Sequence, residues 1–113
     1  MANAAESLST PGQALLDEVV RRVVEAASPD RIILFGSAAR GSAGPDSDLD
    51  LLVVKAGVPH RRRLAQQIYS RLVGLEVPVD VLVVTPEDLE AFRDKVGTII
   101  APALREGREV YVA

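Results

Sequence analysis

Hydrophobic residues recur along the chain with two spacings, and the spacing separates the expected helices from the expected strands. From Thr10 to Ser28 they repeat every three or four residues, as on one face of an α-helix that Thr10 caps and Pro11 begins. Further helices are predicted at residues 59–73, 85–95 and 98–106. Gly107 should end the last of them.

Short apolar runs rich in β-branched residues predict strands at residues 31–35, 48–54, 78–84 and 109–112. The first run is apolar over almost its whole length and should be covered on both faces. Residues 36–45 are rich in Gly, Ser and Ala and predict a loop with one helical turn around residues 38–40. The alternation of helices and strands predicts an α/β fold, a small mixed β-sheet backed by helices.

Length and composition limit the classes of protein to which the chain can belong. With 113 residues, the chain can form one domain, expected at residues 10–113 after a flexible leader at residues 1–9. The absence of cysteine excludes disulfides, thiolate metal sites and cysteine nucleophiles. There is no secretory signal and no apolar run of about 20 residues, which favours a cytoplasmic protein without a membrane span. A net charge of −3 gives no overall attraction to nucleic acid, so a phosphate-bearing ligand needs a local binding device.

Two aspartates, Asp48 and Asp50, stand two residues apart at the start of the second strand. Side chains of a strand alternate between its faces, so these two point to the same side. Asp80 lies within the third apolar run, where burying an unpaired charge is costly. If the second and third strands are neighbours, the three carboxylates form an all-oxygen site suited to Mg²⁺ or Mn²⁺.

A phosphate-binding segment is predicted where the first strand ends. Gly36 lets a phosphate approach the backbone closely, and the helical turn that follows offers free N–H groups. Ser37 can add a hydroxyl hydrogen bond, and Arg40 can supply a positive charge. A phosphate cradle beside metal-ligating carboxylates indicates phosphoryl-group chemistry.

The spacing of these residues resembles a known signature. Gly36-Ser37, followed after ten residues by Asp48-Leu49-Asp50, resembles the Gly-Ser and Asp-x-Asp motif of the DNA polymerase β nucleotidyltransferase superfamily, and its minimal nucleotidyltransferase (MNT) branch most closely. The resemblance implies a palm-like sheet, ATP or another nucleoside triphosphate as substrate, and two divalent ions held by Asp48 and Asp50. Asp80 would complete the second metal site, and Gly36 and Ser37 would grip the β- and γ-phosphates.

The resemblance also implies a partner. MNT proteins similar to this chain are commonly paired with an α-helical HEPN ribonuclease toxin and act as its antitoxin. A first hypothesis is therefore transfer of AMP to a toxin side chain, with tyrosine as the expected acceptor. A second is a binding module that neutralises the toxin by contact and keeps nucleotide affinity without turnover. A third is nucleotidylation of a small molecule, for which a homo-oligomer would have to build the substrate pocket.

Each candidate residue also has a purely structural interpretation. Asp48 and Asp50 could be ordinary surface acids at the start of a strand, and Asp80 could pair with an arginine. Asp46 is expected to cap the turn before the second strand rather than bind metal. The combination of the three aspartates with Gly36-Ser37 favours the metal site.

Other polar features lie outside this pattern. The basic run from His60 to Arg63 is expected to be a solvated first helical turn, and the alternative is a patch that contacts nucleotide or RNA. Basic residues there oppose the helix dipole, a small cost that could mark an interaction surface. Tyr69 and Tyr111 are expected to be core or rim aromatics rather than acceptors.

Overall fold

The computed structural model describes residues 11–36, 48–75, 77–93 and 100–113. Its elements are α2 (Pro11–Ala27), β1 (Arg31–Phe35), β2 (Leu49–Val54), α4 (Arg61–Arg71), β3 (Val79–Val84), α5 (Pro86–Phe92), α6 (Ile100–Glu106) and β4 (Arg108–Val112). Each predicted helix and strand has a counterpart, with its ends shifted by a few residues at most. The leader predicted at residues 1–9 and the helical turn predicted around residues 38–40 lie outside the described residues.

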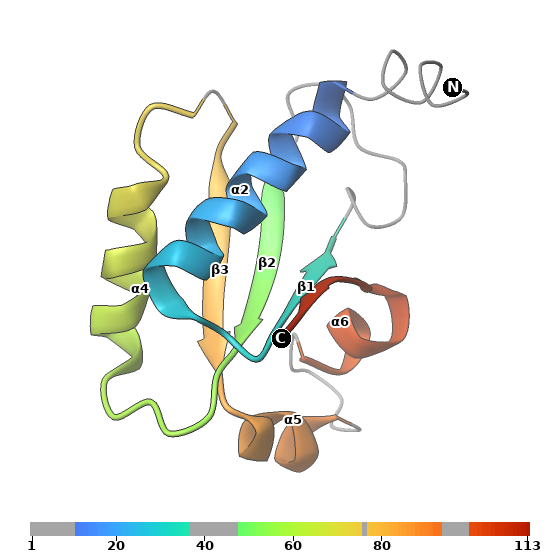
Figure 1. The fold of residues 1–113 in the computed structure, drawn as a ribbon. Helices are drawn as coiled ribbons and strands as arrows, with labels where there is room; N and C mark the ends of the chain where they lie inside the picture. The colour runs from blue at the N-terminus through green and yellow to red at the C-terminus, as the bar shows by residue number, and fades with distance from the viewer. Residues whose placement is uncertain (1–10, 37–47, 76, 94–99) are drawn as a thin grey trace.

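The strands form one mixed sheet in the order β3-β2-β1-β4 (Figure 1). β1 runs antiparallel to both β2 and β4, whereas β2 and β3 are parallel. Parallel strands need a crossover connection, and α4 supplies it. The predicted small mixed sheet is confirmed, and the second and third strands are neighbours.

Helices cover both faces of the sheet (Figure 1). α2 and α4 pack on one face, over a core that includes Val19, Val23, Ile32, Leu34, Leu51, Val53 and Ile68. α6 packs on the other face, over Ile33, Leu52, Val54 and Val84. β1 is therefore buried on both faces, as predicted. Of the helices in the described ranges, none is both long enough and apolar enough to cross a membrane.

Two helix ends have a clear local cause. Ser28 follows α2 with φ 45°, a left-handed conformation, and Pro29 then prevents the helix from continuing. After α6, the Gly107 N–H donates to the Ala103 carbonyl oxygen at 2.8 Å. A Cβ at Gly107 would collide with that same oxygen, so only glycine fits where the helix was predicted to end.

The start of α5 offers a test of stability. Thr85 Oγ1 accepts a hydrogen bond from the Asp88 N–H at 3.1 Å, and the Asp88 carboxylate accepts one from the Thr85 N–H at 3.0 Å. Thr85→Val keeps the shape and removes the first bond of this capping box, so the free energy of unfolding should fall by about 1 kcal/mol. Ser70→Ala, which removes an exposed hydroxyl from α4, should change it by less than about 0.5 kcal/mol. Urea denaturation measures both, and equal effects would contradict the role of the cap.

Candidate functional site

The register between β2 and β3 brings two of the predicted carboxylates together. Asp50 lies directly opposite Asp80 in the parallel ladder. Because strand side chains alternate between faces, both project from the face that carries Leu52 and Val84, on which α6 packs. Asp48 lies immediately before β2, with an exposed side chain.

The surroundings of Asp50 perturb its carboxyl group. Partial burial raises the pKa of Asp50, and the negative charges of Asp80 and then Asp48 raise it further. Asp50 therefore takes up a proton at a higher pH than an isolated aspartate does.

The donor atoms of these side chains fit a hard divalent cation. All of them are carboxylate oxygens, and a positive charge would relieve the repulsion that raises the pKa of Asp50. In the described parts of the chain, no group of three acidic or histidine side chains already converges as a metal cluster. The fold thus forms the Asp50 and Asp80 pair, whereas Asp48 would have to turn toward a cation from its exposed position.

Gly36 lies against this pair because β1 and β2 are antiparallel neighbours. Phe35 is opposite Asp50, so the chain leaves β1 directly beside the Asp50 side chain. Gly36 has φ 78°, a backbone conformation that favours glycine, and a Cβ there would collide with Asp50 Oδ2 unless the Asp50 carboxylate moved. Ser37, Arg40 and Asp46 lie outside the described residues.

Comparison with known proteins identifies the family. Residues 16–104 match the family model described as a nucleotidyltransferase domain. The chain belongs to this family. The matched residues run from α2 into α6 and include Gly36 and all three candidate aspartates.

Individual relatives of this nucleotidyltransferase domain agree with the assignment. A protein from Methanocaldococcus jannaschii described as a "putative protein adenylyltransferase" is 36% identical over 83 residues. That alignment covers 66% of this chain and 56% of the relative, so the chain spans little more than half of the relative's length.

Two solved structures share the fold. A "putative nucleotidyltransferase" from Sulfolobus solfataricus has a TM-score of 0.61 and 20% identity, covering 88% of this chain and 78% of that one. A toxin-antitoxin structure with AMP-PNP has a TM-score of 0.53 and 21% identity, covering 85% and 73%. At such identities the likeness shows the fold alone, and it agrees with the palm-like arrangement that the sequence motif implies.

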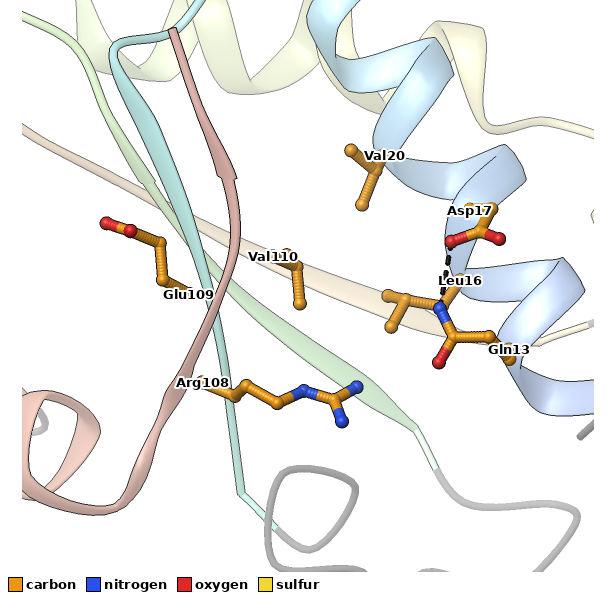
Figure 2. A pocket seen from close by; sticks show the side chains of 7 residues that line it. All are labelled: Gln13, Leu16, Asp17, Val20, Arg108, Glu109 and Val110. Atoms are coloured by element: carbon orange, nitrogen blue, oxygen red, sulfur yellow. Dashed lines mark hydrogen bonds between the residues drawn. The ribbon is translucent and has the colours of Figure 1, made fainter. Parts of the chain in front are cut away.

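A hollow of about 380 Å³ between α2 and β4 lies apart from the carboxylates (Figure 2). Its lining residues are Gln13, Leu16, Asp17, Val20, Arg108, Glu109 and Val110. Leu16 and Val110 belong to the core beneath α2, on the opposite face of the sheet from Asp50. In this nucleotidyltransferase domain the hollow is therefore separate from the candidate site.

The structure also bears on the alternative interpretations. Arg61 pairs with Asp88 at 2.5 Å and so joins α4 to α5, which agrees with a structural role for part of the basic run. Arg62 and Arg63 are exposed and form no ion pair with the residues that the structure describes. Within those same residues Asp80 pairs with no arginine, so the salt-bridge interpretation of Asp80 has no support.

Tyr69 has a contact that sequence reasoning missed. The residue is 41% exposed, as expected of a rim aromatic, but its hydroxyl oxygen accepts a hydrogen bond from the Val81 N–H at 2.8 Å. Val81 follows Asp80 directly. No local motif signals this bond, because it depends on how α4 lies across β3.

Alanine substitutions at two glycines test the contact between Gly36 and Asp50. Gly36 and Gly57 have similar φ values, 78° and 71°, but only Gly57 has open space where a Cβ would lie. We expect Gly57→Ala to lower the free energy of unfolding by about 1 kcal/mol, and Gly36→Ala by about 2 to 4 kcal/mol because its Cβ also displaces Asp50. Guanidinium denaturation measures both changes, and equal losses would show that the contact with Asp50 is absent.

The raised pKa of Asp50 predicts a pH dependence of stability. An acid whose pKa is raised on folding binds its proton more tightly in the folded state, so stability falls as the pH rises from the ordinary value of 3.8 through the raised pKa. In the absence of metal, wild type should lose stability over this range and Asp50→Asn should lose less. Denaturation series from acid to neutral pH check this, and an equal or steeper loss in Asp50→Asn would refute the assignment.

Proposed function

We propose that this nucleotidyltransferase domain transfers AMP from ATP to a hydroxyl group of a partner protein, using divalent ions, Mg²⁺ or Mn²⁺, held at Asp48, Asp50 and Asp80. The observation that carries the proposal is the register of β2 and β3, which places Asp50 and Asp80 on one face beside Gly36. Two like charges held side by side, one of them on the partly buried Asp50, are unfavourable without a cation. The Asp50 and Asp80 pair therefore supports a site in which a bound cation balances the negative charge of the carboxylates.

In the proposed reaction, the acceptor oxygen forms a bond to the α-phosphorus of ATP. The bond from that phosphorus to the oxygen that bridges to the β-phosphate breaks, and pyrophosphate leaves. Two divalent ions, when bound, stabilise the attacking and the leaving oxygens. Asp48 and Asp50 would hold both ions, while Asp80 would complete the second site and accept the proton of the acceptor hydroxyl.

The phosphates of ATP would bind where the chain leaves β1. Gly36 would let the β- and γ-phosphates approach the backbone closely, because it carries no side chain. Ser37 would donate its hydroxyl to a phosphate oxygen, and Arg40 would offset the phosphate charge. The role of Ser37 is what the family resemblance implies, and that of Arg40 is inferred from its charge and its place after Ser37 in the sequence.

The partner is inferred from the relatives. One relative is described as a protein adenylyltransferase, and one solved structure that shares the fold is a toxin-antitoxin complex with AMP-PNP. We infer that the acceptor is a HEPN-type ribonuclease toxin, with the present chain as its antitoxin. An antitoxin that acts by contact alone has no need of the Asp50 and Asp80 pair, which favours the catalytic alternative.

Transfer of label tests the proposal. The full chain is incubated with Mg²⁺, ATP labelled at the α-phosphate and the protein encoded by the adjacent gene. We expect labelling of that protein. Asp48→Ala should lower the labelling about 100-fold or more, because Asp48 would hold the divalent ions whose positive charge stabilises the transition state. Asp17→Asn, an exposed acid on α2, is the matched control and should retain activity.

ATP labelled at the γ-phosphate should give no transfer, because that phosphate leaves within pyrophosphate. Labelling from γ-labelled ATP would instead identify a kinase. No labelling by wild type, or equal labelling by Asp48→Ala, would overturn the catalytic proposal. Neutralisation of toxicity by Asp48→Ala as complete as that by wild type would support the contact alternative.

A further inference from the structure

The strand that carries Asp80 lies at an edge of the described sheet. β3 pairs with β2 on one side. The Leu49 N–H donates to the Pro78 carbonyl and the Lys55 N–H to the Val84 carbonyl, so the even-numbered residues of β3 direct their backbone groups toward β2. Val81 and the other odd-numbered residues direct theirs away from β2.

The half of β3 that holds Asp80 is less buried than the other half. Asp80 and Leu82 are exposed, and the fully buried residues of the strand are Val83 and Val84 at its other end. The charges of Asp80 and Asp50 repel each other across the ladder. The repulsion between Asp50 and Asp80 therefore acts on the half of β3 that apolar burial stabilises least.

Tyr69 on α4 bonds to this half of β3 on the side that faces away from β2. Its hydroxyl oxygen accepts the hydrogen bond of the Val81 N–H at 2.8 Å. That N–H belongs to the same planar peptide group as the Asp80 carbonyl, which points toward β2. The peptide unit that sets the direction of the Asp80 side chain is thus bonded to α4 on one side and directed to β2 on the other.

We propose that Tyr69 is a positioning residue, which keeps the Asp80 carboxylate beside Asp50 and thereby sets the affinity of the carboxylate site for divalent metal. This inference rests on the proposed function, because it requires that the three aspartates bind metal. Tyr69 itself touches neither metal nor nucleotide in this account. It acts through the backbone of β3, and removal of its hydroxyl should release Asp80 without unfolding the domain.

The chain offers a chemically matched control, since it contains two tyrosines. Tyr111 lies on β4, at the opposite edge of the sheet from β3. Its hydroxyl makes no hydrogen bond with the residues that the structure describes. Tyr111→Phe therefore removes the same atom as Tyr69→Phe without touching β3. Thr85→Val serves as a second control, because it lowers stability without altering the bond to Val81.

The test has two readouts in the full chain. Hydrogen exchange of the Val81 amide, followed by NMR in metal-free protein, should accelerate in Tyr69→Phe while the Leu52 amide in the sheet interior stays protected. Titration with Mn²⁺, followed by the EPR signal of the free ion, should show affinity weakened about threefold to tenfold in Tyr69→Phe, the range expected for loss of one hydrogen bond. Both control variants should stay within about twofold of wild type.

Several results would overturn the inference: unchanged exchange at Val81, wild-type Mn²⁺ affinity in Tyr69→Phe, or equal weakening in either control. Asp80→Asn separates this failure from failure of the proposed function. If Asp80→Asn loses Mn²⁺ affinity and Tyr69→Phe does not, the positioning role alone is wrong. If Asp80→Asn binds Mn²⁺ as wild type does, the metal site itself is wrong and the role of Tyr69 falls with it.

Discussion

The rest of the structure depends on the in-register pairing of two parallel strands that each carry an aspartate. Asp50 and Asp80 lie opposite each other, so the fold holds two like charges on one face of the sheet. The same strands end in residues that are buried, among them Val54 and Val84. Apolar burial at one end of the pair thus offsets electrostatic repulsion at the other. Such local conflict within a stable fold is typical of functional sites.

The candidate site is assembled from segments that are far apart in the sequence. β1 brings Gly36, β2 brings Asp50, and β3 brings Asp80 after the α4 crossover. In the proposed reaction these segments serve the nucleotide, and the acceptor comes from outside the chain. On this view the domain is the catalytic half of a two-component system.

The sequence predicted the elements well because their signals are local. Short apolar runs rich in β-branched residues located the strands, and Gly107 marked a helix end that the structure confirms. It also predicted that Asp50 and Asp80 share one face if the second and third strands are neighbours, which the register confirms. The convergence of Asp48 with this pair stays a prediction. Strand order, the Asp50 and Asp80 register and the bond from Val81 to Tyr69 could not be predicted from local pattern, because each depends on how distant segments pack.

The most direct test of the central claim is an NMR titration of ¹⁵N-labelled protein with AMP-PNP in the presence of Mg²⁺. The account predicts that amide shifts cluster at Gly36, Asp50 and Asp80, and that they vanish without Mg²⁺ or in Asp50→Asn. Shifts that cluster instead around Gln13 and Arg108, in the hollow between α2 and β4, would contradict it. So would binding at the carboxylates that is unaffected by removal of Mg²⁺.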